Sequence, residues 1–209
     1  MKKLFPVFSF LVLSSVSLLN AESVSYLFTI NTTAVNGQAD SLDFQLNPGD
    51  VSSPFVTLDI SSFALQGGSF TPSAIQLTGD ASGTLAGDLI LDDNSGFNDA
   101  FQAVELGTSI TFVATFSGAG VDSPASPGVA FGFSIYDGAG TTPLLTTSAD
   151  GTMAGVNLDA SGVVPYMNPA TVGGGPDATV SVVTPEPATV IEMLLGLGLC
   201  AVAYGRKRL

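Results

Sequence analysis

The stretch ITFVATF, residues 110–116, decides the fold class of this chain. Its apolar side chains recur at every second position, with Phe112 and Phe116 the largest of them. Successive side chains of a β-strand point to opposite faces, so this spacing predicts a strand with one buried face. The stretch VAFGFSI, residues 129–135, has the same spacing and predicts a second such strand.

Shorter runs of the same kind lie on either side, separated by Gly, Ser, Thr, Asn and Asp. The turn sequence Asn47-Pro48-Gly49-Asp50 ends one of them. Residues 98–106 predict a short helical turn, and residues 161–177 predict an irregular loop. Ten or so short strands with polar turns predict an all-β domain, an antiparallel β-sandwich or jelly roll. The further strands are expected at residues 24–30, 42–46, 55–60, 74–77, 85–91, 144–147, 153–158 and 178–183.

The charged residues are distributed very unevenly. The 209 residues include 18 acidic and five basic ones, and no histidine. Between Glu22 and Thr184 there are 16 carboxylates and no Lys or Arg, because Glu186 and Glu192 lie beyond that segment. The basic residues are confined to the two ends of the chain: Lys2, Lys3, Arg206, Lys207 and Arg208.

This distribution excludes several classes of function for the segment between Glu22 and Thr184. Binding to nucleic acid or to an anionic membrane surface needs Lys and Arg. A phosphate-binding loop lacks its lysine, and a hydrolytic triad lacks its imidazole. Zinc coordination has neither His nor Cys, because the one cysteine of the chain is Cys200. The same fact excludes a disulfide within the segment.

Residues 1–21 have the pattern of a secretory signal peptide. Lys2 and Lys3 precede an apolar stretch over residues 4–19, and Ala21 provides a small residue at the expected cleavage site. The pattern predicts export across an inner membrane through the Sec machinery. An uncleaved membrane anchor is the alternative. Residues 22–184 then form one exported domain.

The other end, residues 185–209, has three parts in sequence. Pro185-Glu186-Pro187 cannot continue a helix or a β-ladder. An apolar run over residues 188–204 is slightly short for a helix that crosses a bilayer. Arg206-Lys207-Arg208 follows, and the positive-inside rule keeps such an end cytoplasmic.

These three parts resemble the tail of PEP-CTERM proteins of Gram-negative bacteria. The resemblance covers about an eighth of the chain. It implies a transmembrane sorting helix that holds the precursor transiently in the inner membrane until an exosortase cuts it. It also implies a cell-surface or extracellular location and an association with exopolysaccharide and biofilm. Glu192 departs from a purely apolar span, which suits a transient anchor better than a permanent one. A plain membrane anchor is the alternative.

Oxygen-bearing side chains gather around one expected turn, and they make a candidate metal site. Ca²⁺ takes several oxygen ligands from flexible loops. The spacing differs from that of an EF-hand, and Asp and Asn are also ordinary turn residues. The candidate ligands are Asp88, Asp92, Asp93, Asn94 and Asp99.

The composition argues against catalysis and leaves binding functions open. A glycosidase pair would depend on aspartates, because the domain has only Glu22 and Glu105 as glutamates. Tyr26, Tyr136 and Tyr166 are candidate aromatic platforms for a sugar. We expect a non-enzymatic structural or adhesive component of a polysaccharide matrix, whose carboxylates bridge to acidic polymers through divalent cations. A carbohydrate-binding module is the alternative, and a polysaccharide hydrolase is the third.

Overall fold

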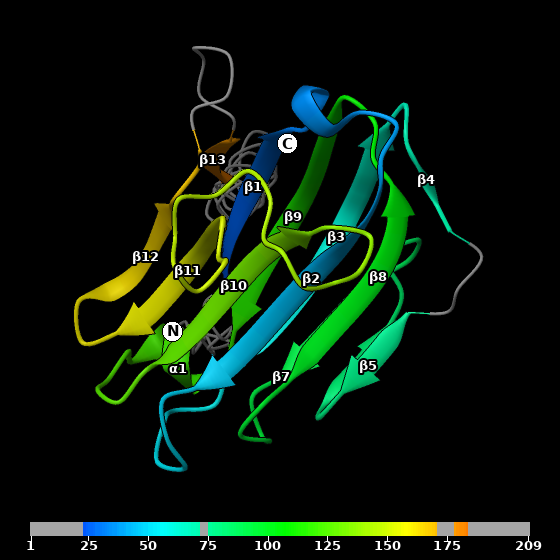
Figure 1. Ribbon diagram of the computed structural model, residues 1–209. Coiled ribbons are helices and arrows are strands. Elements are labelled where there is room, and N and C mark those ends of the chain that lie inside the picture. Colours follow the sequence, from blue (N-terminus) through cyan, green and yellow to red (C-terminus); the bar gives the residue numbers. More distant parts are fainter. Residues whose placement is uncertain (1–22, 72–74, 171–177, 184–209) are drawn as a thin grey trace, which may run out of the picture.

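The protein is all-β, as the alternating stretches predict. The computed structural model describes residues 23–71, 75–170 and 178–183. Two antiparallel sheets form a sandwich-like domain, and their long strands are seen side by side in Figure 1. The first sheet has the order β13 (Ala178–Val183), β1 (Ser23–Asn31), β9 (Ser109–Ser117), β3 (Thr57–Gln66), β7 (Leu89–Asp92) and β6 (Ala81–Gly83).

The second sheet carries the candidate site described below. Its order is β12 (Gly162–Met167), β11 (Ala154–Asp159), β10 (Val129–Tyr136), β2 (Ala39–Pro48), β8 (Asp99–Glu105) and β4 (Ser69–Phe70), with β5 (Gln76–Thr78) also paired to β8. Two single turns of helix lie outside the sheets, η1 (Thr33–Val35) and α1 (Ala119–Asp122).

The pairing between the long strands is nested along the chain. β1 pairs with β9, β2 with β8, and β3 with β7, so each strand meets one that follows much later in the sequence. The chain passes from one sheet to the other between β1, β2 and β3, and again between β8, β9 and β10. In these strands, most of the alternate residues that face the other sheet are apolar.

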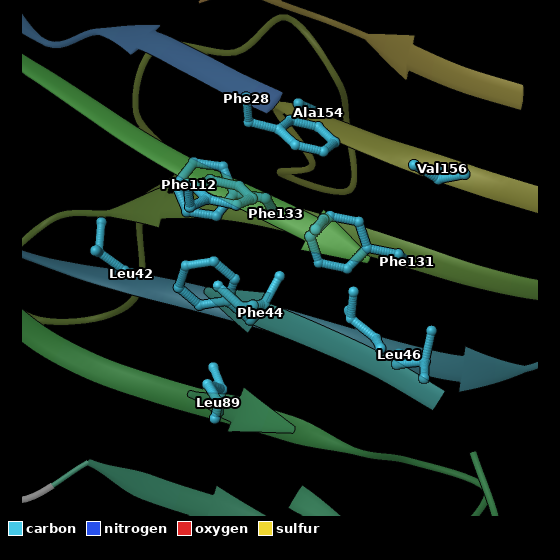
Figure 2. Close-up of a cluster of buried hydrophobic side chains, with 14 of the residues drawn as sticks. Phe28, Leu42, Phe44, Leu46, Leu89, Phe112, Phe131, Phe133, Ala154 and Val156 are labelled. Carbon is cyan, nitrogen blue, oxygen red and sulfur yellow. The ribbon is translucent and has the colours of Figure 1, made fainter. Parts of the chain in front are cut away.

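The core lies between these two inward faces and is dominated by phenylalanine. Phe112 of β9 stacks on Phe28 of β1, with ring centroids 4.8 Å apart. From the opposite sheet, Phe44 of β2 and Phe133 of β10 approach Phe112 to 5.3 and 5.2 Å. All four rings are fully buried, and they are grouped together in Figure 2. The predicted alternation at 110–116 and 129–135 is therefore confirmed as the source of the core.

Several sequence predictions are wrong in detail. Residues 98–106 are not a helical turn, because Asp99–Glu105 is β8, which lies between β2 and β4 in the second sheet. Gly162–Met167 is β12 rather than part of an irregular loop. The expected strand at 144–147 is absent, and this segment has only an isolated bridge from Thr146 to Pro169. β3 begins at Thr57 and β7 at Leu89, each later than expected.

Candidate functional site

Two hollows flank the turn that follows β2, and Pro48 and Gly49 line both of them. The first, which we call the end hollow, has a volume of about 380 Å³ and lies between the segments 48–55 and 93–96. The second, which we call the face hollow, has a volume of about 360 Å³ and lies over β2, β10 and β11. The turn predicted at residues 47–50 therefore forms the wall between the two hollows.

The wall is held by hydrogen bonds from both sides of the turn. The Gly49 backbone N–H donates to the carbonyl of Gly128 at 2.7 Å, and the Ser53 hydroxyl donates to the same carbonyl at 2.8 Å. Asp50 Oδ1 accepts from the backbone N–H and the hydroxyl of Ser52. These bonds stabilise the charged carboxylate and lower the pKa of Asp50 below its ordinary value.

Asp93 fixes the far side of the end hollow. Its Oδ1 accepts from the backbone N–H of Val56 at 3.0 Å, and its own N–H donates to the Val56 carbonyl at 3.2 Å. The side chain is only 7% exposed, and burial raises its pKa. Asp93 therefore joins the loop after β7 to the start of β3. The exposed side chains of Asn94 and Phe55 lie at the rim of the same hollow.

One wall of the face hollow is polar, and small residues form its floor. Asn47 Nδ2 donates to Gln45 Oε1 at 3.2 Å, and Asn47 Oδ1 accepts from the backbone N–H of Asn98 at 2.9 Å. Asn157 of β11 is exposed on the opposite wall, two residues before Asp159. Ala130 and glycines form the floor, so no bulky side chain fills the space.

Together the two hollows present amide, carboxylate and hydroxyl groups beside glycine and alanine residues. Such groups hydrogen-bond to polyhydroxylated molecules, and the exposed ring of Phe55 offers an apolar face beside them. No basic side chain lies in either lining.

The structure does not bring the predicted metal ligands together. Asp88 is exposed near Asp59, and Asp92 accepts from the Thr57 hydroxyl at 2.6 Å. Asp93 is bonded to Val56 as described, and Asn94 lines the end hollow. Asp99 lies in the other sheet, against Asp43. Within the described part of the chain, no group of three or more Cys, Asp or Glu side chains is arranged around one metal position.

The contact between Asp43 and Asp99 was missed by the sequence analysis. Asp43 lies on β2, and Asp99 opens β8 two register positions along. Burial and the Asp99 carboxyl raise the pKa of Asp43 to about 8. The signal available in the sequence was the run Asp43, Gln45 and Asn47, in which polar residues alternate with buried apolar ones along a single strand.

None of the three tyrosines lines the end hollow or the face hollow. Tyr26 is only 4% exposed, and its hydroxyl donates to the Val163 carbonyl at 3.0 Å. The half-buried ring of Tyr136 packs against Phe101, with centroids 6.3 Å apart, on the outward face of the second sheet. Tyr166 lies over Gly155 of the neighbouring strand.

The predicted processing sites lie outside the described residues. They are the cleavage position after Ala21, the motif Pro185-Glu186-Pro187 and the basic end Arg206-Lys207-Arg208. Among the residues that the structure does describe, no helix is long and apolar enough to cross a membrane.

The comparisons with known proteins give no relatives. No protein-family model matches the chain, and no curated protein or solved structure matches it significantly.

Proposed function

We propose that this chain is an exported, non-enzymatic protein of a polysaccharide matrix and that it binds glycans through the end hollow and the face hollow. The observation that carries the proposal is the position of these two hollows on either side of Pro48 and Gly49, with exposed amide side chains at Asn94 and Asn157. We take the nested strand pairing as support for a jelly roll, an architecture that recurs among lectin domains.

The charge of the domain selects the class of glycan. The segment from Glu22 to Thr184 carries 16 carboxylates and no basic residue, so an acidic polymer is repelled unless cations intervene. A neutral polysaccharide meets no such barrier. Its hydroxyls can donate to carboxylate and amide oxygens and accept from the amide groups of Asn94 and Asn157. We therefore assign neutral hexose polymers as the ligand class.

The export part of the proposal is supported by the two ends of the sequence. The signal-like residues 1–21 and the PEP-CTERM-like residues 185–209 together favour an exosortase substrate that is released or attached outside the inner membrane. Mass spectrometry of the protein from its native host tests this part. The expected mature form lacks Arg206 to Leu209, and a mature form that keeps them would contradict it.

The binding part is tested by affinity electrophoresis of the purified chain in gels that contain soluble neutral or acidic polysaccharides. We expect retardation by at least one neutral polymer and none by acidic polymers in the presence of a chelator. Asn94→Ala and Asn157→Ala each remove an exposed amide from one hollow and should reduce the retardation. Both positions are exposed, so neither substitution should lower stability.

The matched control is Asn36→Ala. Asn36 is also exposed, and it lies before the start of β2, at the opposite end of that strand from the hollows. Its retardation should equal that of the unchanged protein. Equal loss in all three variants, or migration that no neutral polymer slows, would refute binding through the hollows.

A further inference from the structure

Two carboxyl groups are diagonal neighbours on the outward face of the second sheet. Asp43 of β2 lies directly opposite Phe101 of β8, and Asp99 of β8 lies opposite Gln45. The two aspartates are therefore diagonal neighbours, and the Asp99 carboxyl is close enough to raise the pKa of Asp43. Asp43 is only 5% exposed, whereas Asp99 is partly exposed at the start of its strand.

The protein supplies too few donors for these oxygens. Asp43 Oδ2 accepts from Gln45 Nε2 at 2.8 Å. Asp43 Oδ1 and Asp99 Oδ1 are both buried, and neither receives an N–H or O–H from any described residue. A buried carboxylate oxygen without a partner is costly, and two such oxygens side by side also repel each other.

No neighbouring cation offsets the repulsion. Tyr136 of β10 stays neutral near pH 7, because burial and then the charge of Asp43 raise its pKa, with smaller effects of Asp150 and Asp99. No Lys, Arg or His occurs between Glu22 and Thr184, so the domain has no cationic side chain of its own to place there. Either a proton or a cation from solution must therefore relieve the repulsion.

We propose that Asp43 and Asp99 bind a calcium ion. Ca²⁺ accepts a variable number of oxygen ligands in flexible geometry, and it bridges carboxylates that would otherwise repel each other. Asp43 is the anchored ligand, because Gln45 holds its other oxygen. Asp99 opens the site toward solvent, where water completes the coordination shell. With two carboxylates only, the site belongs to the weak class typical of extracellular modules, with a Kd on the order of 10⁻⁴–10⁻³ M.

This inference is independent of glycan binding. The pair lies on β2 and β8, and neither aspartate lines the end hollow or the face hollow. It also differs from the metal site predicted from the sequence, since of those five residues it retains Asp99 alone.

The experiment uses Tb³⁺, a calcium analogue whose emission is excited by energy transfer from a nearby tyrosine. The chain has no tryptophan, and Tyr136 is the tyrosine whose surroundings include both aspartates. In the full chain, purified in mild detergent, we expect tyrosine-excited Tb³⁺ emission that millimolar Ca²⁺ displaces. Ca²⁺ should also raise the Tm more than NaCl of equal ionic strength does.

Three variants locate the ion. Asp99→Asn keeps the shape of the side chain and should abolish both the emission and the Tm increase. Glu105→Gln removes the same charge from an exposed position on the same strand and should change neither. Tyr136→Phe should abolish the emission and leave the Tm increase intact.

Two results would overturn the proposal. Emission and a Tm increase that persist in Asp99→Asn would place the ion elsewhere. A Tm that responds to Ca²⁺ no more than to matched NaCl in the unchanged protein would mean that the two carboxyls share a proton only. Neither result bears on retardation by neutral polysaccharides, so failure here is distinguishable from failure of the proposed function.

Discussion

Phe112 is the side chain through which the two sheets are most directly connected. It stacks on Phe28 in its own sheet and meets Phe44 and Phe133 of the other. Protein interiors are packed like organic crystals, so a ring removed at this position leaves a cavity that its neighbours fill only in part.

The substitution Phe112→Ala should therefore lower the free energy of unfolding by about 3–5 kcal/mol. Urea denaturation followed by circular dichroism measures it. Phe97 is 48% exposed, and Phe97→Ala should cost much less. Similar losses for the two variants would contradict the assignment of Phe112 to the centre of the core.

The Asp43 carboxyl makes stability depend on pH. Burial and contact with Asp99 raise the pKa of Asp43 to about 8, against 3.8 for an ordinary Asp. The folded protein holds this proton to higher pH than the unfolded chain does, so the stability it contributes is lost as pH rises from about 4 to about 8. Asp43→Asn removes this dependence.

The measurement is urea denaturation at about pH 5 and about pH 8.5, with a chelator present to exclude calcium. The unchanged protein should lose stability between the two values, and Asp43→Asn should lose less. An identical pH dependence in both proteins would show that Asp43 titrates normally.

At this scale the sequence reveals the apolar residues better than the polar ones. The alternation at 110–116 identifies Phe112 directly, because burial of every second residue can be recognised within one segment of the sequence. The run Asp43, Gln45 and Asn47 indicates a polar face on one strand, but the sequence does not identify Asp99 as the neighbour of Asp43, since that depends on which strands pair. The turn at residues 47–50 was predicted, but the cavities beside it were not, because segments far away in the chain form their other walls.

Among the elements, β8 and β12 show why local patterns misled. The inward positions of β8 are Ala100, Gln102 and Val104, so its buried face is weakly apolar, and the large ring of Phe101 points outward. In β12 a proline interrupts the run, since Pro165 pairs with Val156. Proline is tolerated in edge strands, and β12 is at the edge of its sheet.

One hydrogen bond ties the edge strand β12 to the first sheet. The Tyr26 hydroxyl of β1 donates to the Val163 carbonyl of β12 at 3.0 Å. Tyr26→Phe should lower the free energy of unfolding by about 0.5–1.5 kcal/mol. It should also speed hydrogen exchange at the backbone amides of β12.

The control is Tyr166→Phe. The Tyr166 hydroxyl lies 3.5 Å from the Phe131 carbonyl, too far for a strong bond, so its loss should matter less. Faster exchange throughout the second sheet in Tyr26→Phe, instead of mainly in β12, would show that the bond does not act locally.

The molecule as a whole is an acidic domain without internal counter-charge. Between Glu22 and Thr184 every ionised side chain near neutral pH is a carboxylate, so each added ionisation increases self-repulsion. Four buried or half-buried aspartates have a raised pKa, which reduces this repulsion by keeping protons bound: Asp40, Asp43, Asp59 and Asp93.

Salt should therefore stabilise the protein. The Debye length falls from about 30 Å at 0.01 M salt to about 8 Å at 0.15 M, and screening weakens repulsion between exposed carboxylates. The Tm, followed by circular dichroism, should rise with NaCl over this range. Glu105→Lys places a cation at an exposed position and should raise the Tm at low salt, with a smaller effect at high salt. A Tm independent of NaCl in the unchanged protein would refute this account.

The pairing of β1 with β13 also fixes how the domain responds to tension. Ser25 is opposite Val183 and Ile30 is opposite Ala178, so the outer ends of the two strands lie together at one end of the ladder. A pulling force between Ser23 and Val183 acts first on the hydrogen bonds at that end of the ladder. The pairs then open one after another, instead of being sheared all at once. The domain yields at low force along this axis, and β13 is the first strand to peel away.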